Sequence, residues 1–164
     1  MLHIRPAGLK DIPLIRELTF KIWPQTYASI LSEAQIAYML DMMYSPATLE
    51  RQMDKEQSFI VCFDDAEPLG FAAYQSLDGA VFKLHKLYIL PGKQGQGIGK
   101  FIMTYIQNDI RQKGAVLLDV NVNIYNLQAK AFYEKNGFVV VRKEDIDIGS
   151  GYFMNDYGLQ LRID

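Results

Sequence analysis

The 164-residue sequence contains a single cysteine, Cys62. One cysteine excludes an internal disulfide and any zinc cluster built on cysteines. The sequence also lacks an apolar run of the roughly 20 residues that a membrane-spanning helix needs. Its first residues do not show the basic-then-apolar order of a signal peptide. We therefore expect a cytoplasmic protein that does not enter a membrane.

The sequence also has no large excess of positive or of negative charge. Lys and Arg number 17 against 19 Asp and Glu, which gives a net charge of −2. No basic tract marks a nucleic-acid-binding face, so neither DNA nor RNA is expected as a partner. Hydrophobic residues are plentiful, at 49%, and no repeat or linker interrupts the chain. These features predict one domain over residues 1–164, with a small molecule as its ligand.

Helix signals dominate the first third of the chain, after a short strand at 3–7. Asp11 is expected to cap the first helix, because apolar residues at helical spacing follow it. Ser32 opens a capping-box pattern ahead of a second helix. Ser45 precedes a proline, as an N-cap does when proline occupies the first helical position of a third helix.

From residue 58 onward the pattern changes to strands that are later joined by helices. The apolar strand near residue 120 is expected to be buried on both faces. The order of elements predicts an α/β (α+β) fold with a central sheet. The expected elements are strands over 58–63, 69–77 and 81–90, a helix over 98–113, a strand over 116–122, a helix over 127–136 capped by Asn126, and two strands within 138–163.

The segment from Leu87 to Lys100 is the most informative part of the sequence. It runs from a strand into a loop with four glycines and then into a helix. Glycines allow positive φ angles and the close approach of a ligand. Successive N–H groups can then converge on an anion, to which the helix N-terminus adds its partial positive charge. The segment therefore predicts a phosphate or pyrophosphate site.

Two common phosphate motifs do not fit this loop. A P-loop needs a serine or threonine after its Gly-Lys pair, and here Phe101 follows Lys100. A dinucleotide fingerprint needs Gly-x-Gly-x-x-Gly, whereas Gly95, Gly97 and Gly99 are each separated by a single residue. A simple turn between strand and helix would need only one or two glycines.

Two motifs in this order resemble the GNAT superfamily of acyl-CoA-dependent N-acyltransferases. The first is Gln94-Gly95-Gln96-Gly97-Ile98-Gly99, and the second runs from Asn126 through Ala129, Phe132 and Tyr133 to Gly137-Phe138. The resemblance extends from Ile4 to the C-terminus, and it is loosely closest to bacterial spermidine/spermine-type acetyltransferases. It implies the GNAT fold, a mixed, mostly antiparallel, twisted central sheet with one splayed parallel strand pair, flanked by helices.

The resemblance also implies acetyl-CoA as a cosubstrate, held between the strands 81–90 and 116–122, and no metal. Backbone groups of the first strand would pair with the pantetheine arm as an added strand does. Amides of the glycine loop would bind the pyrophosphate, and basic residues nearby would meet the 3′-phosphate. The cofactor-binding residues implied in this way are Leu87, Tyr88, Ile89, Gln94, Gly95, Gln96, Gly97, Ile98, Gly99, Lys100, Asn126 and Lys135.

Two residues are implied in catalysis. Tyr133 is the expected general acid that donates its proton to the departing CoA thiolate; packing in the core is the alternative role. His85 is the expected general base, because an alkylammonium with a pKa of about 10.4 must lose a proton before it attacks. An ordered water is the alternative base.

The acceptor is expected to be a primary amine of a small, polyamine-like molecule that attacks directly in a ternary complex. Asp156 or Glu33 could bind its cation. A peptide or protein amine, a catalytically silent acyl-CoA-binding module and a nucleotide or phosphosugar binder are alternatives. Certain aromatic and methionine side chains could line a substrate groove, fill the core or form a homodimer interface. They are Trp23, Tyr27, Tyr38, Met39, Met42, Met43 and Tyr44.

Overall fold

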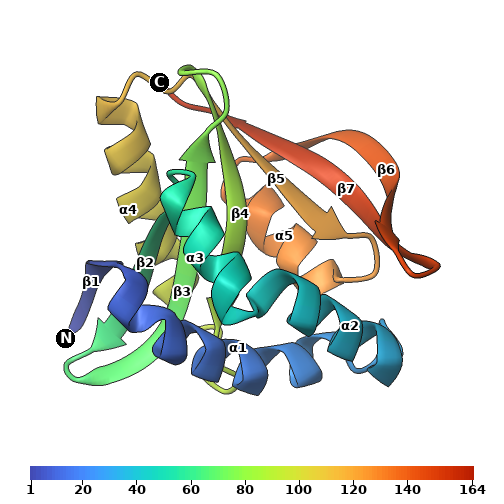
Figure 1. Ribbon diagram of the computed structural model, residues 1–164. Coiled ribbons are helices and arrows are strands. Elements are labelled where there is room, and N and C mark those ends of the chain that lie inside the picture. The colour runs from blue at the N-terminus through green and yellow to red at the C-terminus, as the bar shows by residue number, and fades with distance from the viewer. The chain divides into compact units, whose positions relative to one another are not determined.

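The computed structural model describes residues 1–164 and contains five α-helices and seven β-strands (Figure 1). The sequence predicted each of them, with bounds that differ by a few residues. The helices are α1 (Ile12–Tyr27), α2 (Glu33–Tyr44), α3 (Pro46–Asp54), α4 (Ile98–Gln112) and α5 (Leu127–Lys135), and the strands are β1 (Leu2–Ala7), β2 (Ser58–Asp64), β3 (Glu67–Ser76), β4 (Val81–Ile89), β5 (Leu117–Asn123), β6 (Val139–Gly149) and β7 (Tyr152–Arg162).

The strands form one mixed sheet in the order β1-β2-β3-β4-β5-β7-β6. Packing divides the chain into two compact units, to both of which β4 and α4 contribute. The first unit comprises Met1–Gln75 and Lys86–Ile106, and the second comprises Ser76–His85 and Gln107–Asp164. None of the helices combines the length and the apolar character that crossing a membrane requires.

In the first unit, α1, α2 and α3 lie across one face of the strands (Figure 1). Aromatic side chains form the contact of α1 and α2 with each other and with the sheet. The ring of Tyr44 on α2 lies 5.5 Å from that of Trp23 on α1 and 6.3 Å from that of Phe71 on β3, in edge-to-face geometry in both cases. All three side chains are at most 1% exposed, so they anchor the two helices to the sheet.

Of the three caps predicted for α1, α2 and α3, two form as expected. Ser32 accepts a hydrogen bond from the Gln35 amide at 3.1 Å, and Ser45 accepts one from the Thr48 amide at 3.2 Å. Asp11 occupies the cap position of α1, but its side chain makes no cap hydrogen bond there.

The carboxylate of Asp11 instead pairs with a neighbouring guanidinium, so Asp11 stands at the predicted N-cap position without capping α1 through its side chain. Arg5 donates to both carboxylate oxygens, at 2.9 and 3.1 Å, and the Gly8 amide adds a bond of 2.9 Å. The hydrogen bond from Arg5 lowers the pKa of Asp11 although burial opposes the shift. A bidentate, charge-assisted pair is stronger than a single bond to a helix amide.

In the second unit, β4 and β5 form the parallel pair. Val81–Leu84 lies opposite Leu117–Val120, and β5 pairs on its other side with β7, which carries β6 at the edge. The inward face of β5 is apolar, as the sequence predicted. The opposite face is also largely buried, as predicted, but it is not apolar, because buried Asp119 and half-buried Asn121 place polar groups there.

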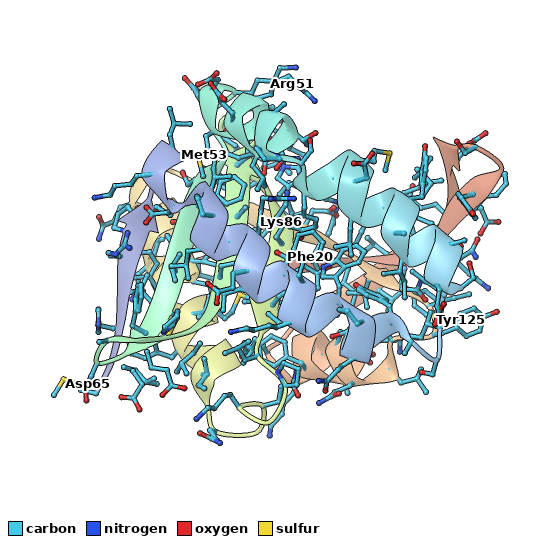
Figure 2. The ribbon with its side chains drawn as sticks, turned by 60° about the horizontal axis from the view of Figure 1, so that its bottom comes forward. Phe20, Arg51, Met53, Asp65, Lys86 and Tyr125 are labelled. Atoms are coloured by element: carbon cyan, nitrogen blue, oxygen red, sulfur yellow. The ribbon has the colours of Figure 1, made fainter.

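A lysine lies in the core of the first unit. The Lys86 ammonium lies 5.5 Å from the centre of the Tyr44 ring and 5.4 Å from that of Phe59, and it donates to Gln52 on α3 at 2.9 Å. The residue is 5% exposed and lies near the junction of α2 and α3 (Figure 2). Burial lowers the pKa of Lys86 from 10.5 to about 8.

This buried lysine predicts a pH-dependent stability. Below about pH 8 the lysine is protonated in both the folded and the unfolded chain, and burying the charge costs about 3 kcal/mol. Between about pH 8 and 10.5 the unfolded chain binds more protons, so the free energy of unfolding rises with pH. The two aromatic faces offset part of the cost, by about 0.5–2 kcal/mol each.

We therefore expect Lys86→Met to raise the free energy of unfolding by about 1–3 kcal/mol at pH 7, and to lose this advantage as the pH approaches 10.5. Denaturant unfolding at several pH values measures the difference. Lys143→Met is the control, because Lys143 is exposed on β6 and its replacement removes no buried charge. A destabilised Lys86→Met protein at pH 7 would show that the pair of rings outweighs the burial of the charge.

Candidate active site

The glycine-rich loop adopts the backbone that the sequence predicted. Gly92, Gly95 and Gly97 have φ angles of +83°, +80° and +78°. Apart from the adjoining residues, no protein atom lies within 4 Å of where a Cβ would stand on any of them. Helix α4 begins directly afterwards at Ile98. The Phe101 amide donates to the Gly97 carbonyl at 3.0 Å, whereas the amides of Ile98, Gly99 and Lys100 have no intrahelical acceptors. The loop therefore exposes unpaired backbone donors beside the positive end of a helix dipole.

Two glutamine side chains of the loop stabilise its backbone conformation through hydrogen bonds. Gln94 Nε2 donates to the Ile89 carbonyl at 3.3 Å, and Gln96 Nε2 donates to the Gly92 carbonyl at 3.4 Å. Lys100 is exposed in the first turn of α4. Open space above positive-φ glycines, a helix N-terminus and a basic side chain fit the pyrophosphate of a CoA molecule.

The strand that leads into the loop belongs to the same unit. Leu87, Tyr88 and Ile89 are partly exposed. The hydroxyl of Tyr88 lies 3.1 Å from that of Tyr27, and its ring lies 5.8 Å from Trp23. The structure therefore places the implied cofactor-binding residues 87–89 and 94–100 on one continuous strand-loop-helix segment.

The remaining site residues belong to the second unit, three of them on α5 or its cap. Tyr133 is 6% exposed and packs edge-to-face on Phe132 and Phe138, with both ring centres at 5.2 Å. Asn126 Oδ1 accepts the Ala129 amide at 3.2 Å, which caps α5 as predicted and leaves Nδ2 as a donor. Lys135, the last residue of α5, is exposed.

His85 is exposed and follows directly after the segment of β4 that pairs with β5. Side chains two residues apart on a strand share a face, so His85 lies on the same face as Lys83, about 7 Å along the strand. Lys83 belongs to a polar network that spans β4, β5, β6 and β7.

Asp119 is the anion at the centre of this network. Arg142 binds both of its carboxylate oxygens, at 2.6 and 2.8 Å, and Lys83 adds a bond of 2.6 Å. Burial alone would raise the pKa of Asp119, but the hydrogen bonds from Arg142 and Lys83 outweigh it and lower the pKa to about 2. The network is therefore charged at neutral pH.

Asn121 connects this ion pair to two more carboxylates. Its Nδ2 donates to Glu144 at 2.9 Å and to Asp156 at 3.2 Å, while its Oδ1 accepts from Arg142 at 2.6 Å and from Lys83. Asp156 is 2% exposed and has no lysine or arginine within ion-pairing distance. Burial raises the pKa of Asp156, and the neighbouring Glu144 charge raises it further.

The sequence prediction missed this network apart from Asp156. A local signal was present, because Asp119, Asn121 and Asn123 recur at every second position, which is the period of one strand face. The side-chain partners of Asp119 and Asn121 lie 21 to 41 positions away in the sequence, so the pairing itself needs the fold.

The predicted substrate-groove residues divide among core, half-buried and exposed positions, and Tyr38 and Met43 are half-buried. Trp23, Tyr27, Met39 and Tyr44 are at most 8% exposed, which supports the core interpretation for these four. Met42 is exposed on α2, as is Glu33, the alternative cation ligand, in the first turn of that helix. The indole nitrogen of Trp23 and the hydroxyl of Tyr44 are buried without a hydrogen-bond partner.

Comparison with known protein families decides the assignment. The family model for an acetyltransferase (GNAT) domain matches residues 27–153. The chain belongs to the GNAT acetyltransferase family. It is an N-acetyltransferase that uses acetyl-CoA, as the glycine loop and the second motif predicted.

Relatives of this GNAT protein include acetyltransferases with different named acceptors. A spermidine N(1)-acetyltransferase of Thermoplasma acidophilum is 29% identical over 93% of this chain and 95% of its own. A peptidyl-lysine N-acetyltransferase of Salmonella typhimurium is 35% identical over 57% of this chain and 59% of its own. The PaiA N-acetyltransferase of Thermoplasma acidophilum, solved with coenzyme A, superposes with a TM-score of 0.84 at 26% identity, covering 99% of both chains. The predicted GNAT fold is thereby confirmed.

Proposed function

We propose that this GNAT enzyme acetylates a primary amine of a small molecule that carries a second positive charge, as polyamines do. The observation that carries the proposal is the network of the second unit. Three carboxylates, Asp119, Glu144 and Asp156, face only two cations, Lys83 and Arg142. With Asp156 ionised, the network has one negative charge in excess.

The position of this excess charge suits an ammonium group. Glu144 is the accessible carboxylate, with its side chain 38% exposed, and buried Asp156 strengthens the negative potential around it. His85 shares the strand face of Lys83 and is exposed to solvent. One ammonium of the substrate would be attracted by Glu144 while another presents its proton to His85. The spermidine acetyltransferase relative supports this class of acceptor.

The proposed chemistry assigns one residue to the deprotonation of the amine and another to the protonation of the departing sulfur. His85, directly or through a water, takes a proton from the substrate ammonium, whose deprotonation at pH 7 otherwise costs about 4.6 kcal/mol. The freed nitrogen lone pair forms a bond to the thioester carbonyl carbon, and the carbon–sulfur bond breaks. Tyr133 gives its phenolic proton to the departing sulfur, and its phenolate regains a proton as the new amide nitrogen loses its second one. Residues 87–89 and 94–100 would hold the donor.

A release assay for the CoA thiol, run over a panel of amines, tests the acceptor. We expect saturable acetylation of spermidine, spermine and short diamines, a higher KM for monoamines of equal length, and a KM that rises with salt because salt screens the attraction. Activity on peptides or aminoglycosides alone would contradict this acceptor class. The peptidyl-lysine relative makes peptide amines the specific alternative in the panel.

Neighbouring carboxylates on β6 provide a matched pair of variants. Successive strand residues face opposite sides, so Glu144 lies in the network while exposed Asp145 points away from it. We expect Glu144→Gln to raise the KM for spermidine about fivefold, which corresponds to about 1 kcal/mol, and Asp145→Asn to leave it unchanged. Equal KM values for the two variants would remove the network from acceptor recognition.

A further inference from the structure

Gly70 lies where β3 touches the end of β4. A Cβ on Gly70 would stand closer than 3.0 Å to the Tyr88 carbonyl oxygen, a separation that real Cβ atoms essentially never show, and 3.1 Å from Ile89 Cα. Both atoms belong to the backbone, so no side chain can rotate away to make room. The φ angle of Gly70 lies outside the left-handed region, so crowding alone excludes a side chain here.

Strand β3 is paired with β2 on its other side, so it cannot easily move away from β4. Gly70 pairs with Cys62 on β2, and the next residue, Phe71, pairs with Val61. Residues 69–74 are buried throughout. On the side of β4, the Leu69 carbonyl accepts the Leu90 amide at 2.8 Å. A side chain at position 70 would therefore displace the end of β4, immediately before the glycine loop.

The contact also fixes which backbone groups of β4 face away from β3. The Tyr88 carbonyl is directed at Gly70. Along an extended strand, the N–H and C=O groups of successive residues point to alternate sides. Leu87 and Ile89 therefore direct their backbone groups away from β3, and the Gln94 side chain reaches the Ile89 carbonyl on that side.

We infer that Gly70 is a positioning residue for acetyl-CoA binding. It lets β3 and β4 approach so closely that Leu87 and Ile89, rather than Tyr88, present their backbone groups to the pantetheine arm. The inference rests on the proposed placement of the donor along residues 87–89. The sequence implied that Leu87, Tyr88 and Ile89 all pair with the pantetheine arm. The inference reduces this set to Leu87 and Ile89.

Gly70→Ala is the direct test. We expect the Kd for CoA, measured by calorimetry, and the KM for acetyl-CoA to rise at least about tenfold, while the KM for the amine changes less than about threefold. Gly8→Ala is the control for glycine replacement, because no atom lies within 4 Å of its Cβ position. Ala72→Gly is the control for a weakened β3, because it loosens the same buried strand without pushing β4.

Amide hydrogen exchange on the unsubstituted protein supplies a second measurement, which decides the matter if Gly70→Ala does not fold. Adding CoA is expected to slow exchange at Leu87 and Ile89 more than at Tyr88. Failure of the unsubstituted protein to bind CoA would contradict the proposed donor site itself. Normal CoA affinity in folded Gly70→Ala, or equal protection of all three amides, would overturn only the role of Gly70.

Discussion

Replacing Tyr133 with phenylalanine is expected to lower kcat by about 10²–10⁴-fold and to leave the Kd for acetyl-CoA nearly unchanged. The lost hydroxyl acts on the charge that develops on sulfur as the thioester bond breaks, so its effect belongs to the transition state. The ring remains, and its edge-to-face contacts with Phe132 and Phe138 keep α5 folded. Steady-state kinetics with the accepted amine, together with calorimetry of acetyl-CoA binding, separates the two quantities.

Tyr125→Phe is the matched control for this substitution. Tyr125 lies just before α5 and is 64% exposed, so removal of its hydroxyl changes neither packing nor chemistry. Equal turnover of the Tyr133→Phe and unsubstituted enzymes would remove Tyr133 from the mechanism. It would leave the aromatic packing of α5 as the role of this side chain.

Gly97→Val is expected to weaken acetyl-CoA binding at least about 100-fold. A β-branched residue strongly disfavours the φ of +78° that Gly97 adopts, so the loop must leave the conformation that exposes its amides. Nothing within 4 Å of its Cβ position would clash with the valine. The loss therefore comes from the altered backbone and from a side chain in the space that the pyrophosphate would fill. Calorimetry with CoA measures it.

Gly114→Val separates backbone strain from binding. Gly114 has a φ of +85° at the end of α4, is exposed, and likewise has open space at its Cβ position. The two valines are expected to lower the melting temperature by similar amounts, but only Gly97→Val loses CoA affinity. A folded Gly97→Val protein with unchanged affinity would show that the cofactor does not bind at this loop.

The features that the sequence predicted correctly are local ones. Ser32 and Ser45 cap helices through hydrogen bonds that span three residues, and the loop glycines take positive φ for reasons contained within the loop. The two GNAT motifs are likewise short and contiguous. Such patterns can be read without knowledge of the fold.

The features that the sequence did not predict depend on distant partners. Asp11 fits the pattern of a capping residue, yet Arg5 on the neighbouring strand is the better partner for its carboxylate. The local sequence around Lys86 does not show that the lysine is buried, because the helices α2 and α3 that cover it come from elsewhere in the chain. The network around Asp119 joins four strands, and its residues meet only because β5 pairs with both β4 and β7.

The cysteine of this enzyme also bears on the mechanism. Cys62 is 1% exposed, and burial raises the pKa of its thiol to about 11. A thiol of this kind is almost entirely protonated at neutral pH and is a poor nucleophile. A covalent acetyl-cysteine intermediate is therefore not expected, and the acetyl group should pass directly from acetyl-CoA to the amine.

Two-substrate kinetics tests this direct transfer most directly. Initial rates of CoA thiol release are measured with acetyl-CoA and spermidine varied together, and acetylspermidine is quantified in the same samples. Direct attack in a ternary complex predicts double-reciprocal lines that intersect, with one acetylated amine formed for each thiol released. Parallel lines would reveal an acetyl-enzyme intermediate, and thiol release without acetylated amine would contradict acetyl transfer to this acceptor.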